Sequence, residues 1–461
     1  MKRAILKKLS LTAGLGLTVL FANNAFASTW GDASWTNSGT DNKFSTAANW
    51  SGTLAPTNKG LYFMGNYGTD ALTVHNDLTP EQLTFDMLVF RRNGFNTAFT
   101  ITGSDLHTAA GSGIRTDGGS VPSFAPVTHN LDLRVVQNGV FTFGSGDGDS
   151  YDSVRVKEFV RNNIGNSNYD FRMHAKANGD FIIDKFVLSS GNNTEGHNMN
   201  TRAEGGTGNS RLILGNVEKG SAYNFGIRFW NPTTILTGTA ESGIDFIIQS
   251  SVLIFDTNAK INSNVYFWSD NGTFITNSKN TVTTLTEWRR TNTIGGTGSF
   301  ANLSFNNQGS AGGVHIIAPG DLAATGTLSF VNASYNWGGN LTNTSLQYNW
   351  DFDLDGSYDT LNFLGKLTLE ADNGYLLNVK ALNGAELGFG TYTLIQTGDL
   401  DSVFALDKWA INWNGFDTGI ESASLKVVNG NLVLDVIPEP STWAMLIGGG
   451  TLLLFLRRRR S

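Results

Sequence analysis

A run of aspartates at alternate positions is the pattern with the clearest chemical potential: Asp351, Asp353, Asp355 and Asp359. Acids spaced in this way around a glycine can place several oxygens about one hard cation, as calcium-binding loops do. The twelfth position of such a loop would be a bidentate Glu, but here it is Asn362. This departure weakens the pattern, so the run is expected to be a set of acidic strand residues that precede a turn, and no cofactor is expected. The alternative is a calcium site built from the four aspartates.

Motifs for catalysis are missing from the sequence. Its six histidines are scattered, and no pair stands four residues apart as a zinc-binding helix requires. It contains no G-x-S-x-G elbow, no phosphate-binding loop and no cysteine nucleophile. Two charged groups could serve a site assembled from distant strands: Glu158 with Lys157 and Arg161, and Glu287 with Arg289 and Arg290. Because such groups are typical of a solvated face, we expect no enzymatic activity, with a polysaccharide lyase or hydrolase as the alternative.

Tryptophans offer a second kind of chemistry, because sugar rings can stack on exposed aromatic faces. The candidates are Trp30, Trp35, Trp50, Trp230 and Trp268. Large aromatic residues at the ends of short segments also plug the first turn of a β structure, where they are buried. Rings exposed on one face would favour carbohydrate binding, whereas buried rings would contradict it.

The elements that must position these residues are short strands. Segments such as 181–183, 212–214 and 252–255 are rich in β-branched and aromatic residues and are separated by Gly, Asn and Ser clusters. No stretch of twelve residues has a helical period, so the sequence predicts an all-β fold. The strand spacing, often near twenty residues, predicts a parallel β-solenoid (β-helix) with stacked asparagines at its turns. The alternative is a set of β-sandwich domains.

The segment before the C-terminal tail has strand signals of its own. Its last two strands are joined at Asn429-Gly430, which is a strong hairpin signal. An antiparallel module here would cap the apolar end of a solenoid and prevent growth at its edge. The predicted organisation is a signal peptide, a solenoid body, a C-terminal β module and a sorting segment: 1–27, 28–335, 336–436 and 437–461.

The N-terminus has the order of parts of a secretory signal peptide. The basic residues Lys2, Arg3, Lys7 and Lys8 come first, and the apolar run 9–21 follows. The cleavage signal is Ala25-Phe26-Ala27, so the mature chain is expected to begin at Ser28. Signal peptidase and the general export machinery are therefore expected partners.

The C-terminus combines three parts: the tripeptide Pro438, Glu439 and Pro440, the apolar run 442–456, and the basic tail Arg457, Arg458, Arg459 and Arg460. The two prolines hold the tripeptide extended. The apolar run predicts one short transmembrane helix of about 22 Å, which is less than the roughly 30 Å hydrocarbon core. The arginines are expected to stay in the cytoplasm, with the body outside.

These three parts in this order resemble the PEP-CTERM sorting signal of Gram-negative bacteria. In that family, a membrane-embedded transpeptidase of the exosortase type recognises the tripeptide and releases or transfers the protein to the cell surface. The resemblance implies an inner-membrane-anchored precursor that contacts the membrane through 442–456 before processing. The alternative is an ordinary C-terminal membrane helix. Two stretches of the body, 45–57 and 294–328, also resemble autotransporter-associated β-strand repeats.

The charge balance excludes some partners. The chain has 39 Asp and Glu against 32 Lys and Arg, and eight of those basic residues lie in the two targeting segments. The mature part is therefore strongly acidic, and we expect it to bind neither nucleic acid nor an anionic lipid surface. With no cysteine it cannot use disulfides. The sequence as a whole predicts an exported structural or adhesion protein of the cell surface or extracellular matrix, associated with exopolysaccharide. The alternative is a carbohydrate-binding or polysaccharide-degrading β-helix protein.

Overall fold

A computed structural model gives the architecture of the chain. The described residues are 33–51, 59–64, 71–91, 97–117, 125–144, 151–163, 169–174, 178–190, 198–204, 210–219, 225–230, 233–279, 284–288, 291–305, 313–320, 324–332, 334–337, 345–369, 374–413, 422–437, and the single residues 448, 451 and 458. This part of the chain is nearly all β, with long parallel sheets that are consistent with a β-solenoid. The all-β expectation is therefore confirmed.

Alternation of side chains explains why these segments form strands. In β30 (Ser345–Phe352), buried and partly exposed residues alternate along the whole strand. Leu346, Tyr348 and Trp350 are buried, while Gln347 and Asn349 lie on the other face. Successive side chains of a strand point to opposite faces, so each strand gives one apolar row to the interior and one polar row to the surface.

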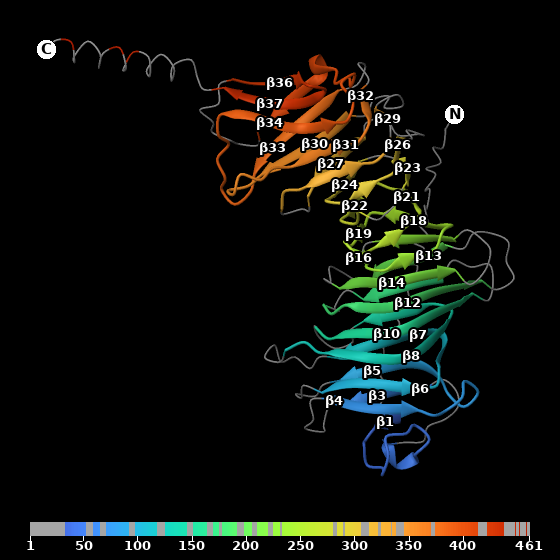
Figure 1. Ribbon diagram of the computed structural model, residues 1–461. Helices are drawn as coiled ribbons and strands as arrows, with labels where there is room; N and C mark the ends of the chain where they lie inside the picture. Colours follow the sequence, from blue (N-terminus) through green and yellow to red (C-terminus); the bar gives the residue numbers. More distant parts are fainter. Residues whose placement is uncertain are drawn as a thin grey trace, which may run out of the picture. The chain divides into compact units, whose positions relative to one another are not determined.

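A first stack of parallel strands begins at the N-terminal end of the described residues (Figure 1). Each strand pairs in parallel with the next strand of the stack. Its members are β1 (Ala33–Trp35), β3 (Lys59–Met64), β5 (Thr84–Arg91), β7 (Leu106–Asp117), β9 (Phe141–Gly144), β11 (Tyr169–His174), β13 (Asn198–Glu204), β15 (Phe225–Trp230), β18 (Ile244–Gln249), β21 (Asn264–Phe267), β23 (Thr284–Trp288) and β26 (Asn302–Phe305).

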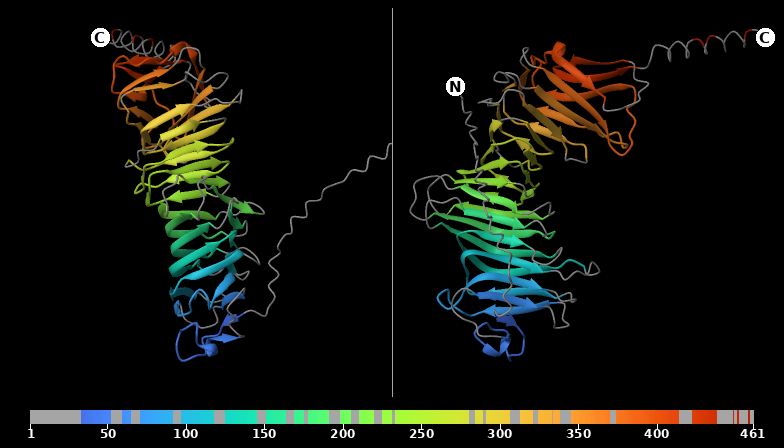
Figure 2. Two further views of the ribbon diagram at one scale, coloured as in Figure 1. Left: turned by 90° about the vertical axis from the view of Figure 1, so that its right-hand side faces the viewer. Right: turned by 180° about the vertical axis from the view of Figure 1, so that it is seen from behind.

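A second parallel stack alternates with the first along the chain. Its strands also pair in chain order. The colours in Figure 2 show strands stacked in the order of the chain. Its members are β4 (Ala71–Asn76), β6 (Ala98–Gly103), β8 (Thr128–Asn138), β10 (Ser153–Asn163), β12 (Phe181–Ser190), β14 (Arg211–Lys219), β16 (Thr233–Leu236), β19 (Val252–Phe255), β22 (Thr273–Thr276), β24 (Asn292–Gly296), β27 (Val314–Pro319), β30, β33 (Tyr375–Ala381) and β35 (Trp409–Asn412).

Shorter strands make three further sets of parallel pairs. Two two-residue strands pair in succession after β14, a third stack lies in the C-terminal part of the chain, and one further pair lies beside it in the sequence. They are β17 (Thr239–Ala240) and β20 (Lys260–Ile261); β25 (Ser299–Phe300), β28 (Thr327–Phe330), β31 (Thr360–Phe363) and β34 (Gly390–Thr397); and β29 (Ser334–Trp337) with β32 (Lys366–Leu369). The only helical elements among the described residues, apart from the single residues of the tail, are two 3-10 turns, η1 (Ala47–Asn49) and η2 (Leu406–Lys408).

The core is a column of inward side chains in register from coil to coil, where a coil is the stretch between one strand and its parallel partner. In the second stack, one such column is unbroken, because each of its residues is the register partner of a residue on the next strand. It consists of Val154, Phe181, Leu212, Thr234, Leu253, Phe274, Ile294, Ile317, Tyr348, Leu377 and Ile411. Removing such residues from water is worth about 1.5–3 kcal/mol for each large apolar side chain, so the column is a main source of stability.

Coil length changes along the chain. Bonds between neighbouring coils join residues 25–31 apart from Asp105 to Arg211, which we call the long coils (residues 98–219). They join residues 19–23 apart in the short coils (residues 225–320). Strand length accounts for part of the difference, because β8, β10 and β12 have 11, 11 and 10 residues while β16, β19 and β22 have 4 each. A spacing near twenty therefore holds for the short coils and is wrong for the long ones.

An aromatic cluster closes the N-terminal end of the first stack. Trp35, Phe44, Trp50 and Phe63 are buried, and the ring centroids of Trp35 and Trp50 are 5.0 Å apart. β2 (Trp50–Ser51) pairs antiparallel with β1 and covers its edge. The Trp50 indole N–H donates to the Phe44 carbonyl at 2.9 Å, so the polar atom of that ring is satisfied inside the cluster.

The C-terminal part is less antiparallel than expected. Parallel pairing continues past residue 336, because β27 pairs with β30, β30 with β33 and β33 with β35. Among the described residues of this part, antiparallel strand pairing is limited to β37 (Asn431–Ile437), which lies between β34 and β36 (Ser422–Val428). Asn429 and Gly430 have φ of 50° and 76°, as a two-residue hairpin turn requires, so the hairpin prediction is confirmed. The antiparallel cap is therefore one hairpin added to a parallel stack, since the inward column keeps the preceding strands in register.

Within the described ranges, no helix has the length and apolarity needed to span a membrane. The predicted transmembrane helix at 442–456 lies outside these ranges, except for Gly448 and Thr451. The signal peptide at 1–27 also lies outside them.

Candidate functional site

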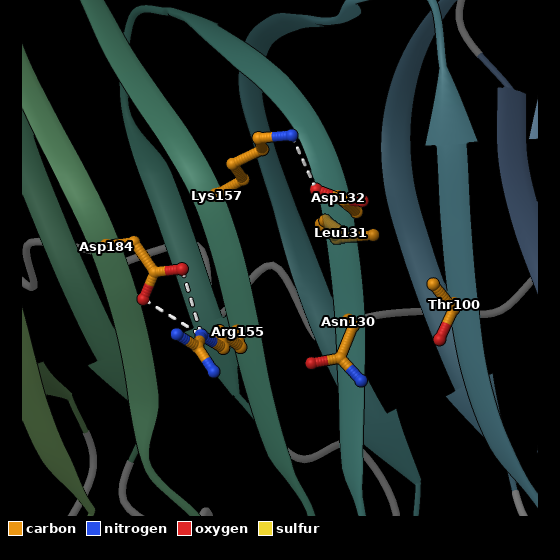
Figure 3. A pocket seen from close by; sticks show the side chains of 7 residues that line it. All are labelled: Thr100, Asn130, Leu131, Asp132, Arg155, Lys157 and Asp184. Carbon is orange, nitrogen blue, oxygen red and sulfur yellow. Dashed lines mark hydrogen bonds and ion pairs between the residues drawn. The ribbon is translucent and has the colours of Figure 1, made fainter.

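A shallow, open pocket of about 370 Å³ lies on the outward face of the long coils. Its walls come from four successive strands of the second stack, β6, β8, β10 and β12 (Figure 3). The lining residues are Thr100, Asn130, Leu131, Asp132, Arg155, Lys157 and Asp184. Because parallel strands lie roughly 4.8 Å apart, side chains far apart in the sequence meet here as neighbours.

Two ion pairs dominate the pocket. The Arg155 Nε atom lies 2.9 Å from both carboxylate oxygens of Asp184, and the Lys157 Nζ atom lies 2.8 Å from Asp132 Oδ1. The hydrogen bond with Asp132 raises the pKa of Lys157, so this side chain stays cationic. Exposed pairs of this kind contribute about 0–1 kcal/mol each to stability. The pocket is thus a polar surface with alternating charge rather than a strong structural clamp.

A β-bulge shapes one side of the pocket. Val156 of β10 pairs with Leu131 of β8, but Glu158 two residues later pairs with Arg134 three residues later. β8 therefore contains one extra residue at the bulge, next to Asp132. Bulges of this kind bend a strand locally and redirect its side chains, which is how Asp132 and Lys157 come to face each other.

A row of opposite charges runs beside the pocket. Asp105 accepts a hydrogen bond from Arg134 Nε at 2.9 Å, and Arg134 is the register partner of Glu158. Glu158 in turn pairs in register with Lys185, whose Nζ atom lies 3.0 Å from Glu218 Oε2. Opposite charges on directly paired strand positions stabilise a sheet by a few tenths of a kcal/mol each. The row therefore continues the alternating charge of the pocket over four coils.

The predicted catalytic trio is not brought together as one site. Lys157 lies in the pocket, Glu158 belongs to the charge row, and Arg161 is buried. In the second group, Arg289 and Arg290 lie outside the described residues, and Glu287 is the register partner of Tyr266. A glycosidase needs two carboxyl groups in different states, one of them free to give a proton. Asp132 and Asp184 are both paired with cations, so neither carboxylate is in the free form that this mechanism requires.

The four aspartates proposed for calcium share one turn but do not surround one point. Asp355 accepts the N–H of Ser357 at 2.9 Å, and Asp353 accepts hydrogen bonds from the Asn383 amide at 3.0 Å. Asp351 lies 3.9 Å from the ammonium group of Lys380. Within the described ranges, no group of three or more His, Asp or Glu side chains is arranged to hold a metal ion. The alternating pattern therefore acts here as a strand followed by a turn.

Asp359 has a structural role in the same turn. Its carboxyl group is buried and accepts the N–H groups of Gly326 at 2.8 Å and Asp351 at 3.1 Å. Burial raises the pKa of Asp359 to about 8, although both hydrogen bonds oppose this rise. The side chain thereby connects β30 to the preceding coil, which the pattern of alternating acids did not reveal.

The tryptophans divide into two groups. Trp35 and Trp50 are 1% and 6% exposed, so a sugar-stacking platform at the N-terminal end is wrong for these two rings. Trp30 lies outside the described residues. Trp230 and Trp268 lie on the first stack, and Trp268 is 48% exposed. Of the candidate tryptophans that the structure describes, Trp230 and Trp268 are the two that it leaves accessible to a ligand.

A buried polar pair was missed in the sequence. The Phe99 N–H donates to His129 Nδ1 at 3.2 Å, and His129 Nε2 lies 3.7 Å from Asp152 Oδ2. Both side chains are buried, and the His129 ring stacks on Phe90 with centroids 4.4 Å apart. No motif could have found the pair, because the two residues come from different coils. Its burial indicates a role in joining coils rather than in catalysis.

The targeting residues lie outside the described ranges, except for Arg458: Ala25, Ala27, Ser28, Pro438, Glu439, Pro440, Arg457, Arg459 and Arg460. Neither a protein-family model nor a curated protein matches this chain. The resemblances to the PEP-CTERM signal and to autotransporter-associated repeats therefore stay predictions that rest on the residues quoted for them.

Proposed function

We propose that this chain is an exported parallel β-solenoid that serves as a structural or adhesion protein of the cell surface or extracellular matrix. An exosortase-type enzyme would act on it at Pro438-Glu439-Pro440, after export through the signal peptide. The observation that carries the proposal is the unbroken inward column from Val154 to Ile411. Such a column supports a rigid scaffold, because each coil is bonded to both neighbours.

One covered end of the first stack and one of the third stack support a scaffold that does not grow there by adding copies. β2 covers the edge of β1 in the first stack, and the hairpin β36–β37 closes one end of the third stack. Open strand edges template the addition of further strands, and Lys426 on the outermost strand β36 discourages this. The active residues of the sorting step would belong to the partner enzyme, and this chain supplies the substrate peptide.

The polar pocket supports an association with exopolysaccharide. Its two ion pairs, with Asn130 and Thr100, present donors and acceptors of both signs on an open face. Hydroxyl-rich chains can exchange hydrogen bonds with such a face without burying a charge. The alternative, a carbohydrate-binding or polysaccharide-degrading protein, is favoured only in its binding form, because the carboxylates of the pocket are held by cations.

Intact mass of the protein from the host surface or medium tests the proposal. The expected mass lacks the residues before Ser28 and those after about Pro440, and deletion of the sorting enzyme restores the tail. Glu439→Gln is expected to retain the tail as well, whereas Glu386→Gln, an exposed acid in the body, should be processed normally. A wild-type protein that keeps 443–461 would overturn sorting and leave an ordinary membrane-anchored protein.

A further inference from the structure

The outward row of three strands in the first stack differs from a solvated strand face. In β15, β18 and β21 the inward residues are fully buried: Ile227, Phe229, Phe246, Ile248, Val265 and Phe267. Because side chains alternate, the intervening residues lie on the opposite face. That face contains Arg228, Trp230, Tyr266 and Trp268, which we call the aromatic face.

Strand register places these residues close together. Trp230 pairs with Gln249, and the N–H of Trp268 donates to the Ile248 carbonyl at 2.9 Å, which continues the ladder to the next strand. Trp230, Gln249 and Trp268 therefore form one row across three strands. The two indoles are two strand spacings apart, roughly 9–10 Å. The neighbouring row consists of Arg228, Ile247 and Tyr266, paired in register.

A cation–π contact fixes the outer ring. The Arg228 Cζ atom lies 4.9 Å from the centroid of the Trp268 ring. Arg228 reaches it from two strands away, across Ile247, which is only 9% exposed although it lies on the outward face. Trp268 is thus held in place while 48% of it stays exposed. An aromatic ring held in this way is preorganised to bind, since little side-chain entropy remains to be lost.

We infer that the aromatic face binds a polysaccharide chain, with sugar rings stacked on Trp230 and Trp268 and their hydroxyl groups bonded to Gln249 between them. Sugar rings have apolar C–H faces and a polar rim, so they fit rings that alternate with an amide. The hydroxyls of Ser250 and Ser269, 3.0 Å apart, follow the same strands and add polar partners. This inference rests on the proposed function and adds a second place for its polysaccharide, on the first stack of the short coils and separate from the polar pocket of the long coils.

A protein partner fits this surface less well. Stable protein interfaces bury about 800 Å² on each side around an apolar centre. The aromatic face spans three strands and includes the polar side chain of Gln249 between its two tryptophans. In the described residues 33–330, the other exposed large apolar side chain is Tyr151, which belongs to a different part of the fold. A narrow row that follows the strand stack suits an extended chain of repeating units.

The test is calorimetric titration of the full-length protein in detergent with polysaccharide extracted from the extracellular matrix of its host. Wild type is expected to bind. Trp268→Ala should weaken binding about tenfold or more, and the double variant W230A/W268A should abolish it. Trp268→Phe, which keeps an aromatic ring, should retain most of the affinity. Tyr151→Ala is the matched control and should bind as wild type does, because it removes an equally exposed ring elsewhere.

Unchanged affinity in W230A/W268A, or no binding by the wild type, would overturn the inference. Far-UV circular dichroism confirms that each variant is folded. Should W268A fail to fold, Arg228→Gln supplies the second readout, because releasing the Trp268 ring should weaken binding several-fold. This test needs no sorting enzyme, so its failure would leave the proposed export and processing intact, and failure of processing would leave the binding result intact.

Discussion

The long coils and the short coils use different side chains to join neighbouring strands. In the long coils, neighbouring strands are joined on the surface by ion pairs such as Arg155 with Asp184 and Arg211 with Asp180. In the short coils, amide and hydroxyl groups join neighbouring coils, for example Asn277 with the N–H of Thr297 and the buried Ser278 with the carbonyl of Ala259. The inward column continues unchanged through both.

This difference indicates that the surface of a stacked fold can change in sequence while its core stays the same. The column needs apolar side chains in register, and it accepts any coil length that returns the chain to register. Corners and outer rows are then free to vary. Long coils have room for long charged side chains, whereas a coil of about 20 residues turns so tightly that short Asn, Asp and Ser side chains reach the backbone of the next coil.

The largest expected effect comes from the shared column. Phe181→Ala in the long coils and Phe274→Ala in the short coils should each lower the free energy of unfolding by about 3–5 kcal/mol, because each leaves a cavity beside other phenylalanines. Hydrogen exchange should show faster opening in the adjacent coils only. Ile182→Ala, on the outward face, serves as the mild control. Uniform loss of protection along the chain would contradict independent coils.

Lowering the pH should reduce the stability of the short coils through His315. Burial lowers the pKa of His315 to about 3, whereas the unfolded chain has a His pKa near 6.5. Between about pH 6.5 and 3 the unfolded chain binds a proton that the folded chain does not. The unfolding free energy should therefore fall with decreasing pH, by up to roughly 1.4 kcal/mol per unit.

Denaturant titrations at pH 7 and 4.5 measure this effect. His315→Leu should remove the part of the acid sensitivity that belongs to this site, and hydrogen exchange should place that part in the short coils. If wild type and His315→Leu lose the same stability between the two pH values, the assignment to His315 is wrong.

Surface bonds of the short coils should contribute less. Asn277→Ala removes the acceptor for the Thr297 N–H at 3.1 Å and should cost about 1–2 kcal/mol in thermal or denaturant unfolding. Since both partners are uncharged, the loss should be the same at low and high salt. A loss that disappears in 1 M salt would show that charge is involved after all.

The smallest effect is expected for the ion pairs of the long coils. Arg155→Gln should cost about 0.2–1 kcal/mol, and the double variant with Asp184→Asn gives the coupling energy of the pair. Because both groups are exposed, this coupling should shrink toward zero in 1 M salt. A coupling above about 2 kcal/mol would mean that the pocket is far less hydrated than its open form indicates.

Strands were predictable from the sequence because their signal is local. Segments such as 181–183 and 252–255 are strands, and the Asn429-Gly430 turn is where the hairpin signal placed it. The coil length was predictable only in the short coils, because loops and strands of different length hide the repeat elsewhere. The pocket could not be predicted at all, since it depends on the register of β8, β10 and β12 and on a bulge that shifts it.

Residue types alone suggested a ligand site in two places where the structure has none, at a turn after a strand and at the end of a stack. Acids at alternate positions suggested a cation site, but burial of Asp359 between two backbone N–H groups uses that side chain to join coils instead. Trp35 and Trp50 likewise suggested a platform, while the end of a stack requires large rings to fill it. In both cases the deciding factor was position along the stack, which the local sequence does not encode.

The separability of coils has a mechanical consequence for a chain that is pulled from its two ends. Tension along the strand stack would load the hydrogen bonds between the outermost coil and the rest, and those bonds would fail one coil at a time. Each short coil of 19–23 residues would then release about 70 Å of slack. A force-extension trace should show a series of small steps in place of one abrupt rupture, so the fold would behave as a shock absorber between whatever holds its two ends.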